Sequence, residues 1–332
     1  MSSAIAHALG TVSASIPSPT VSYIQLGPLQ IHFYALFIMT GIVIAAFMTN
    51  SRLTRRGAEP WVVIDISLLA VPIALVGARI FHVATHLDFY FGEGKNPWNP
   101  LQYGSVWAIW EGGIAIFGAL LGGAVGAWLG CKWTGIRFWT FADALAPGIL
   151  LAQAIGRLGN WFNNELFGLP TTLPWGLEIS SDNPAFPTGL PEGTLFHPTF
   201  LYEMIWNVLG VFVILWLSHR FTIQWGKLFA VYLMWYGAGR IVWESIRIDP
   251  SEIFFGIRTN VWAAIFAVVV GFAIYVIQSR RHPGLEPSPY MPGRARKDVS
   301  ADVESQNDSS DFVDVSPPPA AEPAIGSSAT SA

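Results

Sequence analysis

Charged residues and cysteine are scarce in this chain. Only 12% of its 332 residues are charged, whereas 52% are hydrophobic, a balance that excludes an ordinary soluble domain. Cys131 is the single cysteine, so no intrachain disulfide can form, and we expect its thiol to be inert. The scarcity of charge indicates a membrane protein.

Several common site motifs are also missing. The chain has no phosphate-binding P-loop, no dinucleotide fingerprint and no Gly-x-Ser-x-Gly elbow. His82 and His86 stand four residues apart, but neither an HExxH motif nor a suitable third ligand accompanies them. We therefore expect no metal site and no cofactor, and the lack of a basic patch predicts no nucleic-acid partner.

Long apolar runs are abundant instead. Seven runs approach the ~20 residues that cross ~30 Å of hydrocarbon. The sequence therefore predicts an all-α polytopic membrane protein with seven transmembrane helices. The runs cover residues 31–48, 61–83, 106–129, 138–155, 199–217, 228–246 and 261–277.

Lysine and arginine gather in every second connection between these runs. Twelve of the 18 basic residues follow the first, third, fifth or seventh run. The positive-inside rule makes these connections cytoplasmic, which places the amino terminus outside and the carboxyl terminus inside. The other six basic residues lie within runs or on the predicted outer side, against the positive-inside rule. A role in function is one reason for a charge in such a place. They are Arg79, Lys95, Arg157, Arg240, Arg247 and Arg258.

The composition divides the chain into three parts. Residues 1–22 carry no basic residue and no apolar core of signal-peptide type, so we expect a short extracytoplasmic tail. Residues 23–281 would form the transmembrane domain, with the long connection 158–197 building a small extracytoplasmic head. Proline, serine, alanine and acids dominate residues 282–332, which predicts a disordered cytoplasmic tail.

A stripe of small residues marks the third run. Gly118, Gly122, Gly126 and Gly130 recur every four residues and would lie along one face of a helix. Such stripes let helices approach closely. We interpret this one as a packing surface and not as a site.

The densest polar segment lies between the fourth and fifth runs. Residues 156–168 read Gly-Arg-Leu-Gly-Asn-Trp-Phe-Asn-Asn-Glu-Leu-Phe-Gly. Polar groups near a bilayer are costly and usually line a cavity, and a guanidinium beside amides suits a phosphate. The segment predicts a phosphate-recognising site at a membrane surface. The alternative is a helix-ending loop whose polar groups cap neighbouring helices.

The sixth run carries charges on one helical face. Tyr236, Arg240, Glu244 and Arg247 follow one another at intervals of three or four residues. Because this run is predicted to lead outward, Arg240 and Arg247 should lie level with Arg157. The alternative is an Arg240–Glu244 ion pair that neutralises itself.

Two further segments add polar groups on the predicted outer side. Residues 197–203 read His-Pro-Thr-Phe-Leu-Tyr-Glu, and residues 110–113 read Trp-Glu-Gly-Gly. A histidine at a helix start is more often a cap or a core group than a catalyst, so His197 is open to both interpretations. Tyr34 opens the first run, where tyrosine is normally an interfacial anchor.

These segments together resemble the prolipoprotein diacylglyceryl transferase family. The family signature, Gly-Arg-x-Gly-Asn-Phe-x-Asn-x-Glu-x-x-Gly, is met by residues 156–168 except that Trp161 replaces phenylalanine. The resemblance extends to residues 110–113 and 197–203 and to Tyr-Gly-Ala-Gly-Arg at 236–240, and it covers most of residues 30–280.

The resemblance implies a bacterial inner-membrane enzyme that transfers the diacylglyceryl group of phosphatidylglycerol to the lipobox cysteine of prolipoproteins. A thioether would form and glycerol phosphate would leave, as the first step of lipoprotein maturation. The implied partners are membrane lipid and prolipoprotein signal peptides. The predicted catalytic residues are Arg157, Arg240, Tyr34, Tyr236, Glu165, His197 and Glu244. The predicted phosphatidylglycerol-binding residues are Arg157, Asn160, Asn163, Gly168, Arg240 and Arg247.

The chain departs from the family at one position that matters for the base. Many members carry a histidine four residues after the second glycine of Trp-Glu-Gly-Gly, and this chain has Phe117 there. His197, Glu165 and Glu244 are the remaining candidates, and the field of two arginines could lower the thiol pKa without a base. Phe200 also replaces a glutamine that is usual in the His-Pro segment.

A lipid transporter or scramblase is the alternative function. Such a protein would distribute polar residues through the bilayer depth and often contain internal repeats. No clear repeat is present, and only Asp65 and Asp143 lie in the predicted cytoplasmic halves of runs.

Overall fold

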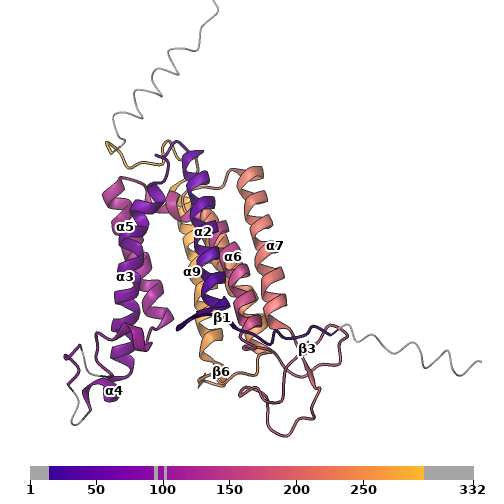
Figure 1. Ribbon diagram of the computed structural model, residues 1–332. Helices are drawn as coiled ribbons and strands as arrows, with labels where there is room; N and C mark the ends of the chain where they lie inside the picture. The colour runs from indigo at the N-terminus through magenta and orange to yellow at the C-terminus, as the bar shows by residue number, and fades with distance from the viewer. Residues whose placement is uncertain (1–14, 93–95, 101–102, 295–332) are drawn as a thin grey trace, which may run out of the picture. The chain divides into compact units, whose positions relative to one another are not determined.

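Long helices make up most of the computed structural model, which describes residues 15–92, 96–100 and 103–294. The helices run roughly parallel or antiparallel to one another, and the short strands of the described residues lie toward one end of the bundle (Figure 1). The long helices are α2 (Phe33–Thr54), α3 (Val62–Thr85), α5 (Ile116–Thr134), α6 (Phe138–Phe162), α7 (Thr199–Phe221), α8 (Lys227–Ser245) and α9 (Thr259–Arg281).

Six of these helices are long and apolar enough to cross a membrane, which confirms a multi-pass membrane protein. The set comprises α2, α3, α5, α6, α7 and α9. The sixth predicted run does form a helix, α8, but Arg240 and Glu244 lower its hydropathy, and it is not among the six. The count of seven spans therefore stays a prediction.

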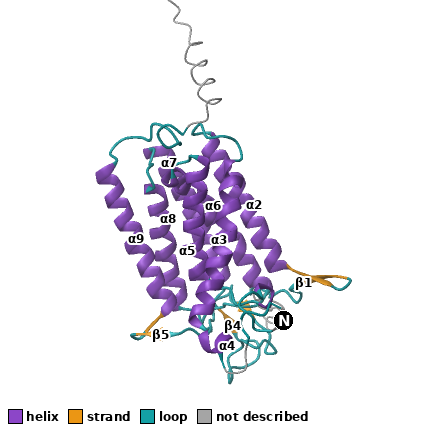
Figure 2. Ribbon diagram, turned by 90° about the vertical axis from the view of Figure 1, so that its left-hand side faces the viewer, coloured by secondary structure: helices purple, strands orange, loops and turns teal. Residues whose placement is uncertain are grey.

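Short strands, loops and the short helix α4 gather at one end of the bundle, which we call the head end (Figure 2). This end carries the connection 163–198 and the short helices α4 (Leu87–Phe91) and η1 (Ile109–Glu111). Three antiparallel strand pairs add short hairpins to the predicted all-α fold. They are β1–β2 (Tyr23–Leu26, Leu29–His32), β3–β4 (Leu177–Glu178, Leu195–Phe196) and β5–β6 (Ile253–Phe254, Ile257–Arg258).

The glycine stripe packs α5 against α3, as predicted. A Cβ atom added at Gly126 would lie 2.7 Å from the Cα atom of Ala70, and one at Gly130 would lie 2.9 Å from the Cα atom of Ile66. Only glycine allows such an approach. Figure 1 shows the pair α3–α5 side by side, and α2 packs on α6 and α8 on α9.

The third helix begins later than the sequence predicted. Residues 106–115 form η1 and a glycine turn, and α5 starts at Ile116. The guanidinium of Arg79, buried in α3, donates hydrogen bonds to five backbone carbonyls of residues 105–113. Gly112 and Gly113 adopt φ angles of 92° and 72°, which glycine tolerates without strain. Arg79 therefore organises this connection.

Residues 15–20 belong to the head, although the sequence analysis placed them in a tail. Ile16 pairs with Leu177 in a parallel bridge, with its N–H donated to Gly176 (2.9 Å) and its carbonyl accepting from Glu178 (2.9 Å). Ile16 also packs on an apolar cluster that includes Phe196. We call residues 15–20 and 163–198 the head. The rest of the predicted amino-terminal tail, residues 1–14, lies outside the described residues.

Residues 282–294 are packed, which corrects the predicted start of the disordered tail. Tyr290 is buried in an apolar cluster with Leu53 and Ile66 at the end opposite the head. Its hydroxyl accepts the N–H of Glu59 at 2.8 Å and its carbonyl accepts from Arg137 Nε at 2.7 Å. The tail composition suggested disorder, but one buried aromatic ring and these bonds hold the segment. Residues 295–332 lie outside the described residues.

Candidate active site

An ion-pair network joins three helices at the head end. Arg157 on α6 contacts Glu203 on α7, with Nη2 and Oε2 2.5 Å apart. Arg240 on α8 lies 3.7 Å from the same oxygen and 2.7 Å from Glu244 Oε2. The two arginines predicted from the sequence therefore meet across Glu203, a carboxylate that is only 5% exposed.

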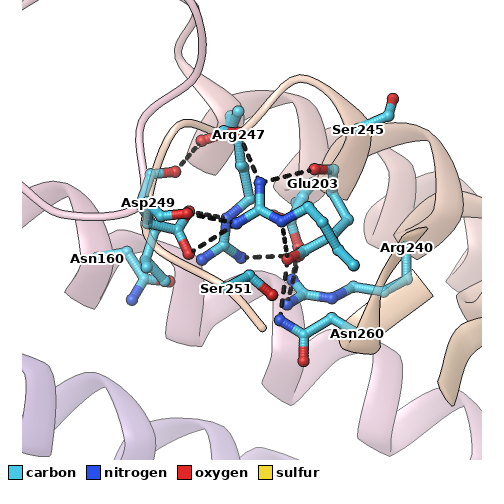
Figure 3. A network of polar contacts seen from close by, with 12 residues as sticks. Asn160, Glu203, Arg240, Ser245, Arg247, Asp249, Ser251 and Asn260 are labelled. Atoms are coloured by element: carbon cyan, nitrogen blue, oxygen red, sulfur yellow. Dashed lines mark hydrogen bonds and ion pairs between the residues drawn. The ribbon is translucent and has the colours of Figure 1, made fainter. Parts of the chain in front are cut away.

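Glu244 anchors the other half of the network, and Figure 3 shows Arg240, Arg247 and Asn260 gathered in this region. Its side chain is fully buried, and besides Arg240 it contacts Arg247 at 3.4 Å and Arg258 at 3.3 Å. Asn260 donates a further hydrogen bond to Oε1 at 2.9 Å. The predicted Arg240–Glu244 ion pair is present, but it is one part of a larger cluster. The paired groups are Arg157, Arg240, Arg247 and Arg258 with Glu203, Glu244 and Asp249.

Four guanidinium groups against three carboxylates leave this cluster with one positive charge. Arg247 lies just beyond the last residue of α8. Burial lowers the pKa of Arg247, but the hydrogen bond and charge of Asp249 and the charge of Glu244 outweigh it and raise the pKa above its ordinary value. Arg247 therefore stays charged, and its guanidinium group suits an anionic partner.

The signature segment ends α6 and turns its polar side chains toward Arg157. Arg157 Nη1 donates to Asn160 Oδ1 at 3.2 Å, and Asn160 Nδ2 donates to Glu165 Oε1 at 2.9 Å. Asn163 Nδ2 donates to the same Glu165 oxygen at 3.3 Å. The segment thus terminates a helix, as one interpretation predicted, and also builds a polar chain onto a guanidinium, whereas the phosphate-recognising site stays a prediction.

Gly168, the last residue of the signature segment, packs against the backbone near His197 and near Arg247. It forms an isolated antiparallel bridge with Arg247. A Cβ atom at this position would lie 2.8 Å from the Cβ atom of His197 and 3.1 Å from the carbonyl oxygen of Ile246. The glycine therefore permits close approach of three backbone segments at the edge of the arginine network.

The two predicted tyrosines reach the network from different sides. Tyr34 on α2 lines a cavity together with Arg157 and Asn160. Tyr236 on α8 lines a much smaller pocket beside Glu203 and Arg240. Both positions are thus adjacent to the arginines, although neither tyrosine belongs to the ion pairs.

His197 is not brought into the network. Its Nδ1 atom lies 3.2 Å from the Tyr202 hydroxyl, and its backbone carbonyl accepts the N–H of Gly168. Phe117, at the usual histidine position, packs with Phe81 on α3 at a ring-centroid distance of 6.1 Å. His197 is therefore outside the ion pairs, although Gly168 joins its backbone to that of Arg247 at the edge of the network.

A cavity of about 740 Å³ leads from the network into the bundle. Its walls come mainly from α2, α3, α5 and α6 and are mostly apolar. Tyr34, Arg157 and Asn160 lie where it approaches the head end, since α2 begins and α6 ends there. Phe141 and Ala142 line the opposite part. The cavity has the polarity of a lipid, with a polar end and a long apolar body.

Several network residues were missed or underrated in the sequence analysis. Glu203 was visible as the last residue of the His-Pro segment, and Arg258 was among the six basic residues in unexpected places. Asp249 and Asn260 had no sequence signal, because their contacts depend on how the chain turns between α8 and α9.

Asp143 does not lie on a polar path through the bundle. Its buried carboxylate accepts the backbone N–H groups of Gly226 and Phe229 at 2.8 and 2.9 Å. These bonds satisfy the free donors at the start of α8. One of the two residues that favoured a transporter is therefore a cap, which weakens that alternative.

The fold and site define a multi-pass membrane protein with a cationic site beside an apolar cavity. A family model described as prolipoprotein diacylglyceryl transferase matches residues 21–277. The chain therefore belongs to the prolipoprotein diacylglyceryl transferase family and is a transferase, which confirms the resemblance noted in its sequence.

Relatives in several bacteria are similar over most of their length. A phosphatidylglycerol–prolipoprotein diacylglyceryl transferase of Leifsonia xyli is 64% identical over 297 residues, covering 88% of this chain and 89% of the relative. The Streptomyces coelicolor protein of that name numbered 2 is 46% identical over 82% of this chain and 84% of its own length. A Bifidobacterium longum relative is 44% identical over 87% of this chain and 92% of its own length.

Proposed function

We propose that the chain transfers the diacylglyceryl group of phosphatidylglycerol to the lipobox cysteine thiol of prolipoproteins. A thioether forms and glycerol phosphate leaves. One observation carries the proposal: an apolar cavity ends at Arg157, which Glu203 links to Arg240. The acyl chains would occupy the cavity, and the phosphate would meet the guanidinium groups.

The reaction breaks the bond between the glyceryl carbon and a phosphate oxygen as a sulfur–carbon bond forms. The electron pair of the broken bond leaves with the phosphate, so negative charge grows on that group. Arg157 and Arg240, fixed by Glu203 and Glu244, would stabilise this charge without reorganising. Removing one such donor commonly costs about 3–4 kcal/mol of barrier.

The thiol proton needs an acceptor, and the geometry favours Glu165. Both Glu244 oxygens contact guanidinium groups, which suits an anchor better than a base. His197 contacts Tyr202 away from the network. Glu165 is linked to Arg157 through Asn160, and within the described part of the chain its carboxylate accepts two hydrogen bonds, both at Oε1, which leaves Oε2 to take a proton. We infer that Glu165 is the base and that Tyr34 and Tyr236 position the substrate.

We also propose seven membrane spans with the head outside. The seventh span would be α8, which has 19 residues like α5 and packs beside α7 and α9. Basic residues cluster at the end opposite the head, which the positive-inside rule makes cytoplasmic. This cluster comprises Arg52, Arg55, Arg56, Lys132, Arg137, Arg220 and Lys227.

A transfer assay in liposomes tests the function. The assay supplies phosphatidylglycerol and a lipobox-cysteine peptide and follows the peptide mass. Arg157→Ala and Arg240→Ala should each lower the rate by two to three orders of magnitude, about 3–4 kcal/mol. Arg55→Ala, which changes an exposed arginine at the opposite end, is the matched control and should behave as wild type. No product from folded wild type would favour the lipid-transport alternative.

A further inference from the structure

A second cavity, of about 760 Å³, lies in the head. We call it the head pocket. Its walls come from the amino-terminal segment 18–20, from residues 178–183 at and after β3, from residues 193–195 at β4, and from the signature residue Asn164. Its size is within the ~300–1,000 Å³ typical of ligand sites.

The head pocket is chemically the opposite of the arginine site. Glu178 and Asp182 line it, together with hydroxyl groups such as those of Ser18 and Thr194, and none of its lining residues is lysine or arginine. Carboxylates repel a phosphate and attract N–H donors and basic side chains. The pocket therefore disfavours an anionic lipid headgroup and favours a polypeptide.

Asn164 connects the two sites. Its neighbours in the signature, Asn163 and Glu165, belong to the polar chain on Arg157, whereas Asn164 itself lines the head pocket. Its φ angle of 52° lies in the left-handed region, where the backbone reverses direction and turns successive side chains apart. One turn of chain thus serves both cavities.

The wall around Asn164 is held in place but leaves an acceptor unused. Asn164 Nδ2 donates to the Pro19 carbonyl at 3.0 Å, and Asn183 Nδ2 donates to the Asn164 carbonyl at 2.9 Å. Within the described part of the chain, Asn164 Oδ1 is buried without a hydrogen-bond partner. An unpaired buried acceptor costs free energy, so this part of the pocket wall is incompletely satisfied by the protein itself.

We propose that the head pocket binds the polypeptide segment that follows the lipobox cysteine in the precursor. This inference rests on the proposed transferase function. A cysteine that attacks a lipid whose phosphate meets Arg157 and Arg240 lies at the head end, where Asn164 of the signature turn lines the head pocket. Extended chain advances up to ~3.6 Å per residue, so a short segment reaches from one site to the other.

Peptide length tests the proposal. One peptide ends at the residue after the lipobox cysteine, and the other continues for about ten residues, an extended reach of ~35 Å. Wild type should show a KM for the long peptide about tenfold below that for the short one. Ser180→Trp, which fills the pocket, should raise the long-peptide KM to the short-peptide value. Its kcat and its KM for phosphatidylglycerol should stay unchanged.

Two control comparisons distinguish a blocked head pocket from a general loss of structure. Thr172→Trp adds the same side chain to an exposed head position outside the pocket and should keep the preference for the long peptide. Asp182→Asn should weaken that preference, whereas Glu192→Gln, outside the pocket, should not. The proposal is overturned if wild type does not distinguish the peptides, or if Ser180→Trp distinguishes them as wild type does. Failure of wild type to modify either peptide would instead refute the transferase function.

Discussion

At the scale of single residues, the site depends on carboxylates that hold arginines in place. Glu203 lies between Arg157 and Arg240, and Glu244 lies between Arg240 and Arg258. Buried charges are tolerated only when paired and hydrogen-bonded. Each guanidinium is thus oriented before a substrate arrives, as electrostatic stabilisation of a leaving group requires.

Arg258 is expected to position Glu244 without touching the substrate. Its Nη1 atom donates to the carbonyls of Glu244 and Arg247, and its Nη2 atom donates to the Asp249 carbonyl. Arg258→Ala should lower kcat about tenfold, or about 1.4 kcal/mol, with little change in the KM for phosphatidylglycerol. Arg258→Lys should not restore turnover, because an ammonium lacks the planar fork of donors.

Steady-state kinetics with separate variation of lipid and peptide check this effect. Arg280→Ala, at an exposed position on the same helix α9, is the control and should keep wild-type constants. Wild-type turnover in Arg258→Lys would show that charge alone suffices and would contradict the positioning role.

At the scale of elements, apolar runs predicted the helices well because lipid requires them. The predicted start of α5 was wrong, because hydropathy does not reveal the turn in residues 106–115, which the hydrogen bond between Arg79 and Gly113 helps to hold. The signature residues were found because an arginine and amides stand out beside apolar runs. Asp249 and Asn260 were not found, because their contacts arise only when the turn after α8 folds back onto Glu244.

Substituting alanine for two nearby glycines of α5 should have different effects on stability, because only one of them packs tightly against α3. At Gly126 an added Cβ atom meets the Ala70 Cα atom at 2.7 Å and the Leu69 carbonyl oxygen at 2.8 Å. At Gly123 the nearest atom is the Ala74 side chain at 3.6 Å, an ordinary contact. Gly126→Ala should destabilise by about 1–3 kcal/mol, and Gly123→Ala should be neutral or stabilising. Thermal unfolding in detergent compares them, and equal midpoints would contradict this packing.

At the scale of the molecule, the segment 282–294 braces the end opposite the head. Glu286 accepts hydrogen bonds from Thr140 at 2.7 Å and from the backbone of Trp225 at 2.8 Å. It also lies 3.7 Å from Arg56. With buried Tyr290, these contacts tie together the connections that precede α3, α6 and α8.

Two truncations test this brace. Ending the chain after Arg294 should leave the unfolding temperature and transfer rate unchanged. Ending it after Arg281 removes Tyr290 and Glu286 and should lower the unfolding temperature by several degrees, as expected for a loss of about 2–5 kcal/mol from one buried aromatic ring and its bonds. Identical melting curves for the two forms would show that the segment contributes nothing.

The proposed orientation is tested by labelling single cysteines in intact cells. In a Cys131→Ser background, Thr172→Cys places a thiol in the head and Arg55→Cys places one at the opposite end. Both positions are exposed. A membrane-impermeant maleimide should label the first only, and should label the second after the cells are opened. Labelling of Arg55→Cys in intact cells would reverse the topology.

The bridge between Ile16 and Leu177 has a consequence for biosynthesis. A ribosome makes the first partner long before the second, and the four long helices α2, α3, α5 and α6 lie between the two in the chain. Residues 282–294 likewise form hydrogen bonds with connections that the ribosome made much earlier. Because domains form as their parts emerge, the Ile16–Leu177 bridge cannot form before about half of the chain is made, and the opposite end cannot close before residues 282–294 are made. The newborn protein therefore passes through an incomplete state in which quality-control proteases can reach its unpaired segments.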